Sequence, residues 1–318
     1  MTLTIRNYRD DDLEALVELI NTADAVDQLH EGTSVPELRT VLYQPDSDPH
    51  RDALVVVDEN QRIVGFARLE LKLAPKQNRF YAHALVHPDW REKDVEEPLL
   101  ETLWSTALER RDDLGTKPVQ FRAYCAAHQE DRVALFSSFG LRPVQYSPHM
   151  VCHPLDNLPE PEFPPGTRVR HYVRGQDDES AIETVNESFA DAMDFAPSTL
   201  EEMRHWVASP SFREELSPVA LDGQEVVGLC LCTVSEDRMR LMGRRDAYVD
   251  TLAVRPAYRR RGLGSALLLA SLRAMKEARM ESATLDTDTD NPTEAIRLYE
   301  NVGFREAWRC VTYGKEIP

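Results

Sequence analysis

A basic turn that contains two glycines stands out in the second half of the chain. It reads Arg-Arg-Arg-Gly-Leu-Gly-Ser over residues 259–265 and lies between an expected strand, Tyr248 to Val254, and an expected helix, Gly264 to Arg279. Glycines let a backbone turn tightly and approach a ligand closely. The N-terminus of the following helix offers unpaired N–H groups and the positive end of its dipole. The turn therefore predicts a phosphate-binding cradle, to which the arginines add charge.

A tyrosine in a later helical segment could supply a proton to a reaction. Tyr299 shares a helix face with Ala295, Ile296 and Val302, so we expect its ring to be buried with the hydroxyl at one edge. A phenol in that position can protonate a leaving group. Most buried tyrosines are instead core residues whose hydroxyl finds a backbone partner. The cradle upstream favours the role of proton donor.

The elements that must position these groups alternate between strand and helix. Residues 282–287 are expected to form a strand. The next helix has Asn291 as its N-cap, Pro292 at its first position, Glu294 at its third, and Gly303 just beyond its end. Such alternation predicts an α/β fold with a mixed sheet.

The same pattern is written twice along the chain. Residues 154–166 contain five prolines, which is typical of a semi-rigid linker. We therefore expect two copies of one fold, over residues 1–153 and 167–318, joined by this linker. Four landmarks support the repeat at offsets of 163 to 168 residues: Ile5 to Tyr8 with Val169 to Tyr172, Val64-Gly65 with Val227-Gly228, Val86 to Arg91 with Val254 to Arg259, and Phe139 to Arg142 with Val302 to Arg305.

Composition and charge narrow the class of protein. The formal net charge of −18 over 318 residues argues against nucleic-acid binding, which needs a basic face, and is compatible with a cationic substrate. No apolar run is long enough to predict a membrane span, and the N-terminus lacks a signal-peptide pattern. The five cysteines are scattered, which indicates reduced thiols and a cytoplasmic location.

Two motifs of the second half together resemble a known signature. V-R-P-A-Y-R-R-R-G-L-G-S-A-L-L over residues 254–268, followed by D-N-P-T-E-A-I-R-L-Y-E-N-V-G-F over residues 290–304, resembles the acetyl-CoA-binding signature of the GNAT superfamily of N-acetyltransferases. The resemblance covers most of residues 167–318. It implies two tandem GNAT-like α/β domains, each a mixed, mostly antiparallel sheet flanked by helices. It also implies acetyl-CoA as co-substrate and no metal.

The resemblance gives roles to individual residues. Backbone N–H groups of the turn would hold the CoA pyrophosphate, and the main chain of the preceding strand would pair with pantetheine like an added strand. Asn291 would bond to the pantetheine arm, and Tyr299 would be the general acid. The residues implied in cofactor binding are Leu252, Ala253, Val254, Arg259, Arg260, Arg261, Gly262, Leu263, Gly264, Ser265 and Asn291.

The general base is open at this point. In several relatives a glutamate occupies the strand position that falls on Tyr248 here, so that role does not carry over. Asp250 lies two residues along on the same strand face and could act through water, or it could be an ordinary solvated carboxylate. A base is also dispensable if the amine arrives unprotonated.

The first copy lacks the residues that carry this chemistry. Asp94 and Glu96 replace the two glycines of the turn. A carboxylate about 4 Å from a phosphate charge costs roughly 4 kcal/mol at an effective dielectric constant near 20. Phe136 stands at the tyrosine position and His128 at the asparagine position. We expect the first domain to keep the fold and not the reaction.

Two metal-like patterns are set aside. The acidic run Asp286 to Asn291 resembles a calcium loop, but it has Asn291 where that loop needs glycine and Arg297 where it needs glutamate. His149 and His153 flank Cys152 in the expected last strand of the first copy. Residues four apart on a strand lie about 13 Å apart, too far to share a metal ion. We therefore interpret His149 and His153 as surface histidines.

These observations favour an enzyme that transfers acetyl from acetyl-CoA to a primary amine of a small molecule, by direct attack in a ternary complex. The second domain would be the active one. A non-catalytic acyl-CoA-binding sensor, which would not need Tyr299, and acetylation of a protein N-terminus are the alternatives. The tandem copy would take the place of a second subunit, which is consistent with a monomer.

Overall fold

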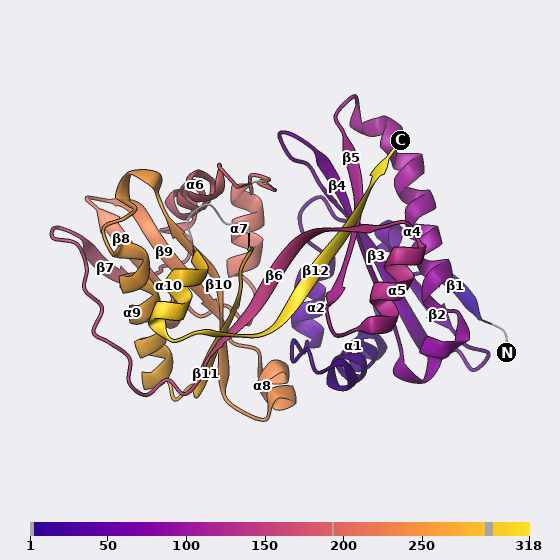
Figure 1. The fold of residues 1–318 in the computed structure, drawn as a ribbon, viewed down its shortest axis with the longest axis horizontal. Coiled ribbons are helices and arrows are strands. Elements are labelled where there is room, and N and C mark those ends of the chain that lie inside the picture. The colour runs from indigo at the N-terminus through magenta and orange to yellow at the C-terminus, as the bar shows by residue number, and fades with distance from the viewer. Residues whose placement is uncertain (1–2, 193, 290–294) are drawn as a thin grey trace. The chain divides into compact units, whose positions relative to one another are not determined.

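The computed structural model describes residues 3–192, 194–289 and 295–318. It divides into two compact units, each of which has its own set of strands and its own core (Figure 1). The first unit comprises Met1–Tyr146 together with Cys310–Pro318, and the second comprises Ser147–Arg309. Both have the predicted fold class, a mixed, mostly antiparallel sheet with helices on its faces.

The second unit repeats the element order that the sequence predicted. Its strands follow the order β6-β11-β10-β9-β8-β7, and the pairing of β10 with β11 is parallel while β11 pairs with β6 in the antiparallel sense. The elements are β7 (Arg168–His171), α6 (Asp178–Phe189), α7 (Leu200–Val207), β8 (Pro218–Asp222), β9 (Glu225–Thr233), α8 (Glu236–Met242), β10 (Asp246–Val254), α9 (Leu263–Glu277), β11 (Ser282–Asp286) and α10 (Ala295–Val302).

Helices cover both faces of this sheet, and alternate residues of its central strand face them. Cys230 of β9 belongs to the core that α9 and α10 form on one face (Figure 1). Leu229 and Leu231 belong to the core that α6 and α7 form on the other. Because successive side chains of a strand point to opposite faces, a strand buried on both sides reads as the continuous apolar run seen here.

The first unit has the same architecture. Its strand order is β1-β2-β3-β4-β5-β12, with β4 and β5 parallel. The elements are β1 (Thr4–Asn7), α1 (Leu13–Asp27), α2 (Val35–Leu42), α3 (Pro49–Asp52), β2 (Ala53–Val57), β3 (Ile63–Lys72), β4 (Asn78–Val86), α4 (Glu96–Arg111), β5 (Val119–Ala126), α5 (Glu130–Ser138), β6 (Arg142–Cys152) and β12 (Arg305–Ile317).

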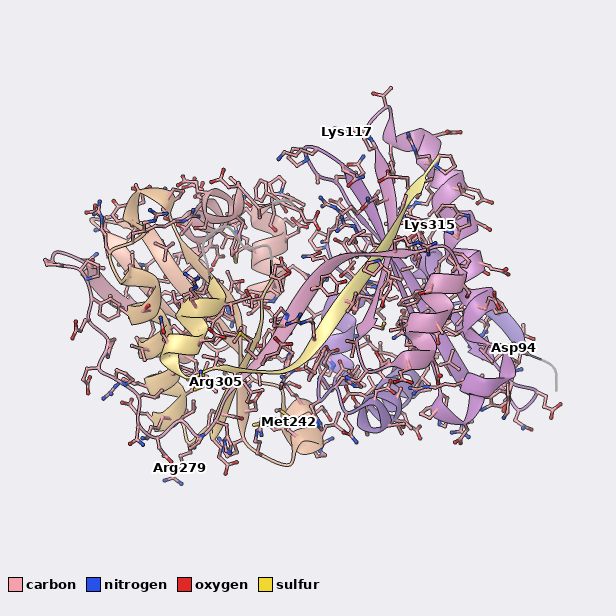
Figure 2. All side chains as sticks on the ribbon, in the orientation of Figure 1. Asp94, Lys117, Met242, Arg279, Arg305 and Lys315 are labelled. Carbon is pink, nitrogen blue, oxygen red and sulfur yellow. The ribbon has the colours of Figure 1, made fainter. Side chains whose placement is uncertain are left out.

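The units depart from the predicted limits because each sheet is completed by a strand from the other sequence repeat. Residues 149–152 of β6, from the first repeat, pair with β11 of the second unit. Residues 310–317 of β12, from the second repeat, pair with β5 of the first unit. There Lys315, which is labelled in Figure 2, has its Nζ 3.9 Å from the ring centroid of Trp104. A pleated pattern shows which face of a strand is buried and not which strand it pairs with.

The individual elements of the second half agree closely with the prediction. The expected helix over residues 264–279 is α9, and the expected strands over 248–254 and 282–287 are β10 and β11. The N-cap signals at Asn291, Pro292 and Glu294 lie outside the described residues. Among the described helices, none has the length and apolar character needed to cross a membrane.

The strand from the second repeat makes a testable contribution to the first unit. Tyr313 is 5% exposed and packs against Phe136 with the ring centroids 5.5 Å apart. Tyr313→Ala should lower the free energy of unfolding of the first unit by roughly 3–5 kcal/mol, because it leaves a cavity in the core. Native-state hydrogen exchange of the β4 and β5 amides would measure this loss.

Glu316→Ala is the matched control, because Glu316 lies on the same strand but is exposed and accepts hydrogen bonds from Gln77 and Gln120. Its effect should stay within about 0.5 kcal/mol. Equal exchange rates in the Tyr313 variant and the wild type would contradict the assignment of this strand to the first unit.

Candidate active site

The turn before α9 has a backbone conformation suited to an anion. Arg260 and Gly262 both have positive φ angles, 59° and 82°. Gly262 is the N-cap of α9 and no side chain caps the helix. The N–H of Ala266 donates to the carbonyl of Gly262, so the N–H groups of residues 263–265 point out of the helix end. Successive N–H groups in such a turn, at a positive helix end, form a concavity for phosphate oxygens.

The two glycines of the turn serve different purposes. A Cβ on Gly262 would have the Glu162 carbonyl oxygen as its nearest neighbour, at 4.0 Å, so this position is open. A Cβ on Gly264 would lie 3.3 Å from Leu298 of α10 and 3.7 Å from Val254 of β10. Gly262 therefore supplies the left-handed turn, and Gly264 allows α9 to start close to the end of β10.

Two arginines at the turn have structural partners. Arg259 donates through Nη2 to the Ser188 carbonyl at 2.5 Å, and its backbone N–H bonds to the Pro256 carbonyl at 3.3 Å. Arg255 is 8% exposed and bonds to Thr184, with ion pairs to Glu225 of β9 at 2.6 Å and to two glutamates of α6 at 3.1 and 3.5 Å. The cofactor role predicted for Arg259 is thus weakened, since its N–H is already bonded. Sequence analysis did not single out Arg255, which anchors the turn.

The remaining arginines of the turn are accessible. Arg260 and Arg261 are exposed, and the guanidinium of Arg261 lies 5.7 Å from the ring centroid of Tyr258. Ser265 is half-buried in the first turn of α9. The cationic side chains available to an anion at this turn are therefore Arg260 and Arg261.

Strand β10, which leads into the turn, pairs with β11 along only the first part of its length. β10 and β11 pair from Asp246 and Ser282 up to Tyr248 and Thr284. A buried network holds this closed part: Asp246, which is fully buried, accepts hydrogen bonds from Arg238 at 3.2 Å and from Thr284 at 2.9 Å. Within the described residues, β11 has no partner residue for 249–254 of β10. That edge of β10, which includes Leu252, Ala253 and Val254, is open for main-chain pairing.

Asp250 lies at an irregularity in the same strand. The register with β9 shifts between Val249 and Thr251, which leaves Asp250 as the extra residue of a bulge that re-aims its side chain. The carboxylate is exposed, yet the protein around it removes enough water to raise the pKa of Asp250 to about 6. A hydrogen bond from Thr251 opposes the rise, and the negative charge of Asp286 adds to it.

Tyr299 lies in α10 as predicted. It is 8% exposed, and its ring meets Phe304 edge-on with the centroids 6.0 Å apart. Burial raises the pKa of Tyr299, so the phenol keeps its proton at neutral pH. Tyr299 therefore carries the proton that a proton donor needs.

A cluster on β6, β10 and β11 was missed by the sequence analysis. Asp286 accepts a hydrogen bond from the Tyr248 hydroxyl at 2.8 Å and pairs with Nδ1 of His149 at 2.9 Å. His149 is 3% exposed, so its interpretation as a surface histidine is wrong. The reason is the exchange of strands, which places it inside the second unit's sheet. His153 is exposed, as predicted, and bonds to the Glu281 carbonyl.

The equivalent turn in the first unit is filled by its own side chains. Asp94 adopts a positive φ of 50°, and Glu96 pairs with Arg132 at 2.9 Å in the first turn of α4. Arg91 makes a two-pronged ion pair with Asp27 at 2.6 and 2.8 Å.

The other positions of the first unit also differ from the second. Phe136 is 1% exposed, and His128 bonds to the Asp27 carbonyl at 2.9 Å. The parallel pairing of β4 with β5 continues for five residue pairs, from Asn78 with Val119 to Ala82 with Ala123. The pairing of β4 with β3 shows no register shift.

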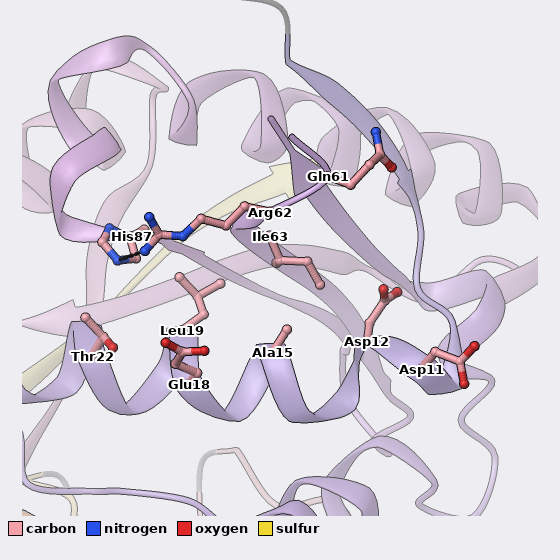
Figure 3. Close-up of a pocket in the computed structure, with 10 residues that line it drawn as sticks. All are labelled: Asp11, Asp12, Ala15, Glu18, Leu19, Thr22, Gln61, Arg62, Ile63 and His87. Carbon is pink, nitrogen blue, oxygen red and sulfur yellow. Dashed lines mark hydrogen bonds between the residues drawn. The ribbon is translucent and has the colours of Figure 1, made fainter. Parts of the chain in front are cut away.

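Two cavities lie in the described parts of the units. One of about 230 Å³ in the first unit has Arg62, which bonds to His87 at 3.0 Å, on one side, and the carboxylates of Glu18 on α1 and of Asp11 and Asp12 on the turn before α1 on the other (Figure 3). Neither Glu96 nor Phe136 lines it, so it is separate from the turn before α4. The other, of about 170 Å³, adjoins the turn before α9 through Tyr258, Arg261 and Leu263. Among the described residues, no three metal-ligating side chains converge.

Comparisons with known proteins agree with this geometry. Residues 181–304 match the model of the acetyltransferase (GNAT) family. The mycothiol acetyltransferase of Thermobispora bispora is 28% identical over 291 residues, covering 91% of this chain and 90% of that protein. A GCN5-related N-acetyltransferase from Sphaerobacter thermophilus has a TM-score of 0.74 at 24% identity, covering 99% of this chain and 96% of that one. A tandem GNAT protein from the clavulanic acid biosynthesis pathway has a TM-score of 0.73 at 17% identity, covering 100% and 99%.

The two solved structures show that this chain shares their fold over its whole length. The second unit contains a GNAT acetyltransferase domain, as the two sequence motifs predicted. This domain and the curated relatives together support an N-acetyltransferase. The family to which that domain belongs uses acetyl-CoA.

Proposed function

We propose that this chain transfers acetyl from acetyl-CoA to a primary amine of a small molecule, by direct attack in a ternary complex within the second unit. The observation that carries the proposal is the uncapped, left-handed turn at Gly262 at the end of a strand whose outer edge is open. The first is a site for phosphates and the second a site for an extended amide chain, which are the two parts of CoA that a protein must hold.

The residues of the second unit fit acetyl-CoA in order along the strand and turn. The N–H groups of residues 260–265 would hold the pyrophosphate, with Arg260 and Arg261 adding charge. The open main chain of Leu252, Ala253 and Val254 would bond to pantetheine as an added strand does. Asn291, predicted to bond to the pantetheine arm, lies outside the described residues.

The chemistry needs an oxyanion site and a proton for the departing thiolate. Attack of the amine on the thioester carbonyl makes an oxyanion, which N–H groups on the open edge of β10 would stabilise. The oxyanion then re-forms the carbonyl, the C–S bond breaks with its electron pair going to sulfur, and the Tyr299 hydroxyl gives its proton to that sulfur. Asp250 would attract the cationic amine and could take its proton through water.

The first unit would keep the fold without the reaction. Its turn carries Asp94 and Glu96, its proton-donor position is Phe136, and its asparagine position is His128. Each of these features removes one requirement of acetyl-CoA binding or turnover. We therefore expect one acetyl-CoA site per chain.

The relatives suggest where the acceptor should be sought. The tandem arrangement with one intact half resembles mycothiol acetyltransferase in organisation, and the chain is 28% identical to one such protein. An amine on a cysteinyl pseudo-disaccharide is therefore the first acceptor to test, followed by aminoglycosides and polyamines.

The turn can be tested by calorimetric titration of acetyl-CoA. We expect one site per chain, and Gly262→Asp should weaken binding by about three orders of magnitude. The reason is that a carboxylate about 4 Å from a phosphate charge costs roughly 4 kcal/mol, and each 1.4 kcal/mol is tenfold in affinity.

Gly262→Ala separates charge from backbone strain, because it adds a Cβ at the same φ without a carboxylate. Its loss of affinity should be far smaller than that of the aspartate. Two sites per chain would show that the first unit binds the cofactor after all, and equal affinities of the wild type and Gly262→Asp would contradict the cradle.

Tyr299→Phe should lower kcat by about 100-fold while the acetyl-CoA dissociation constant stays within about twofold, because the variant loses one proton donor and keeps its ring. Release of the CoA thiol with an accepted amine would measure kcat. Tyr172→Phe is the control, since Tyr172 is a buried tyrosine of the same unit whose hydroxyl donates to Asp178. Wild-type turnover in Tyr299→Phe would make this residue part of the core only.

Asp250→Asn should raise KM for a cationic acceptor about tenfold at pH 7.5, where a carboxyl of pKa about 6 is ionised. At pH 5 the wild-type Asp250 is protonated, and the two proteins should have similar KM values. The variant should be at least as stable as the wild type at pH 7.5, because the fold disfavours the ionised form. Asp237→Asn on α8 is the charge-matched control. A KM difference that persists unchanged at pH 5 would count against this role.

A further inference from the structure

The His149–Asp286 pair has the construction of a proton-accepting dyad. The two residues are direct cross-strand partners on β6 and β11, so their side chains lie on the same face of the sheet. Nδ1 of His149 lies 2.9 Å from the Asp286 carboxylate, which fixes the tautomer with the hydrogen on Nδ1. The other ring nitrogen, Nε2, is then the one that can accept a proton. A ring held in this way presents a basic nitrogen on its other side.

Both ends of the dyad are held in place. The His149 ring stacks on Trp308 with the centroids 4.6 Å apart and the planes 15° apart, which limits rotation of the imidazole. Asp286 is fixed from β10 by the Tyr248 hydroxyl, which donates to its second oxygen at 2.8 Å. A carboxylate that receives both a phenol and an imidazole N–H is oriented in full, while its 37% exposure leaves it in reach of solvent.

The dyad lies near the point where β10 and β11 stop pairing. The last paired residues of β10 and β11 are Tyr248 and Thr284, and Asp286 is two residues further along β11. This is the start of the open edge proposed to receive the thioester. The dyad faces away from the α9–α10 core, because the alternate residues Met150 and Leu285 belong to that core. It thus lies on the opposite face of the sheet from Tyr299.

We propose that His149, oriented by Asp286, accepts the proton that the amine acceptor must lose before it attacks the thioester. This inference rests on the function proposed above. The ammonium N–H bond breaks and its proton goes to Nε2, while the freed electron pair forms the C–N bond. Asp286 stabilises the imidazolium, which later releases the proton to water. After the C–S bond breaks, Tyr299 gives its proton to the thiolate, and the second proton of the amine nitrogen passes to the Tyr299 phenolate through water, so charge and protons balance.

Other titratable groups surround the dyad and must be separated from it. Tyr248 and Asp250 lie on β10, Asp288 follows β11 and bonds to Ser147, and Arg238 lies over the Tyr248 ring at 5.2 Å. Tyr248 keeps its proton at neutral pH because burial raises its pKa well above the usual value. Asp250 attracts the amine as a fixed charge above pH 7.

The test is the pH dependence of kcat/KM in His149→Asn, with the amine that the wild type acetylates fastest among cysteinyl glycosides, aminoglycosides and polyamines. The asparagine amide can still donate to Asp286 but has no basic nitrogen. At pH 7 we expect at least about 100-fold lower kcat/KM, with the deficit shrinking about tenfold per pH unit as the free amine forms unaided. The calorimetric dissociation constant for acetyl-CoA should stay within about twofold.

His153→Asn is the matched control, because His153 follows four residues later and is exposed; its profile should equal that of the wild type. Asp286→Asn, which keeps the shape and loses the charge, should give a smaller loss, about tenfold, with the same pH trend. Wild-type kcat/KM in His149→Asn at every pH would overturn the proposal. So would a loss that is equal at every pH and accompanied by weaker acetyl-CoA binding, because that is a structural defect.

Failure of the proposed function would look different. In that case the wild type itself would acetylate none of these amines at any pH although it bound acetyl-CoA. Both the proposed acetyl transfer and the role of His149 in it would then be rejected.

Discussion

The second unit depends on a parallel strand pair that ends early. Strands β10 and β11 are clamped at their start by the buried Asp246, and they have separated by the time β10 reaches Asp250. A sheet that stayed closed would use every main-chain group of β10 internally. Because it opens, the same strand has an edge without a partner on β11, ends in the uncapped turn at Gly262, and leaves Asp286 close to the point where the two strands separate. In the first unit the parallel pair stays closed for two more residue pairs, as far as Ala82 and Ala123, and β4 has no register shift.

Charge is divided in a consistent way around this opening. Arg255 and Arg259 are used inside the protein to fix the turn, while Arg260 and Arg261 stay exposed at it. Carboxylates gather at the other end of the open edge, on Asp250 and Asp286. An anionic cofactor and a cationic amine would thus be drawn to opposite ends of one strand, in a chain whose overall charge is strongly negative.

The sequence predicted the parts of the site that depend on local backbone and missed those that depend on strand partners. Gly262 could be recognised because a turn into a helix without a side-chain cap needs a glycine, and Tyr299 because helical spacing sets its face. His149 could not, because its role comes from pairing with β11, which lies more than a hundred residues away. The same limit explains the domain boundaries: alternation of apolar residues fixes a buried face and leaves the neighbour open. Arg259 shows a third limit, since a motif does not say which arginine is already bonded.

The exchange of last strands has a consequence for the modularity of this protein. A fragment of residues 167–318 would contain the whole second repeat and still lack residues 149–152, which cover the edge of β11. An uncovered edge exposes a row of unpaired N–H and C=O groups and is a template for another chain. The repeat that looks like a separable module in the sequence is therefore not a separable folding unit. Each half of the sequence thus supplies a strand to the sheet that the other half forms.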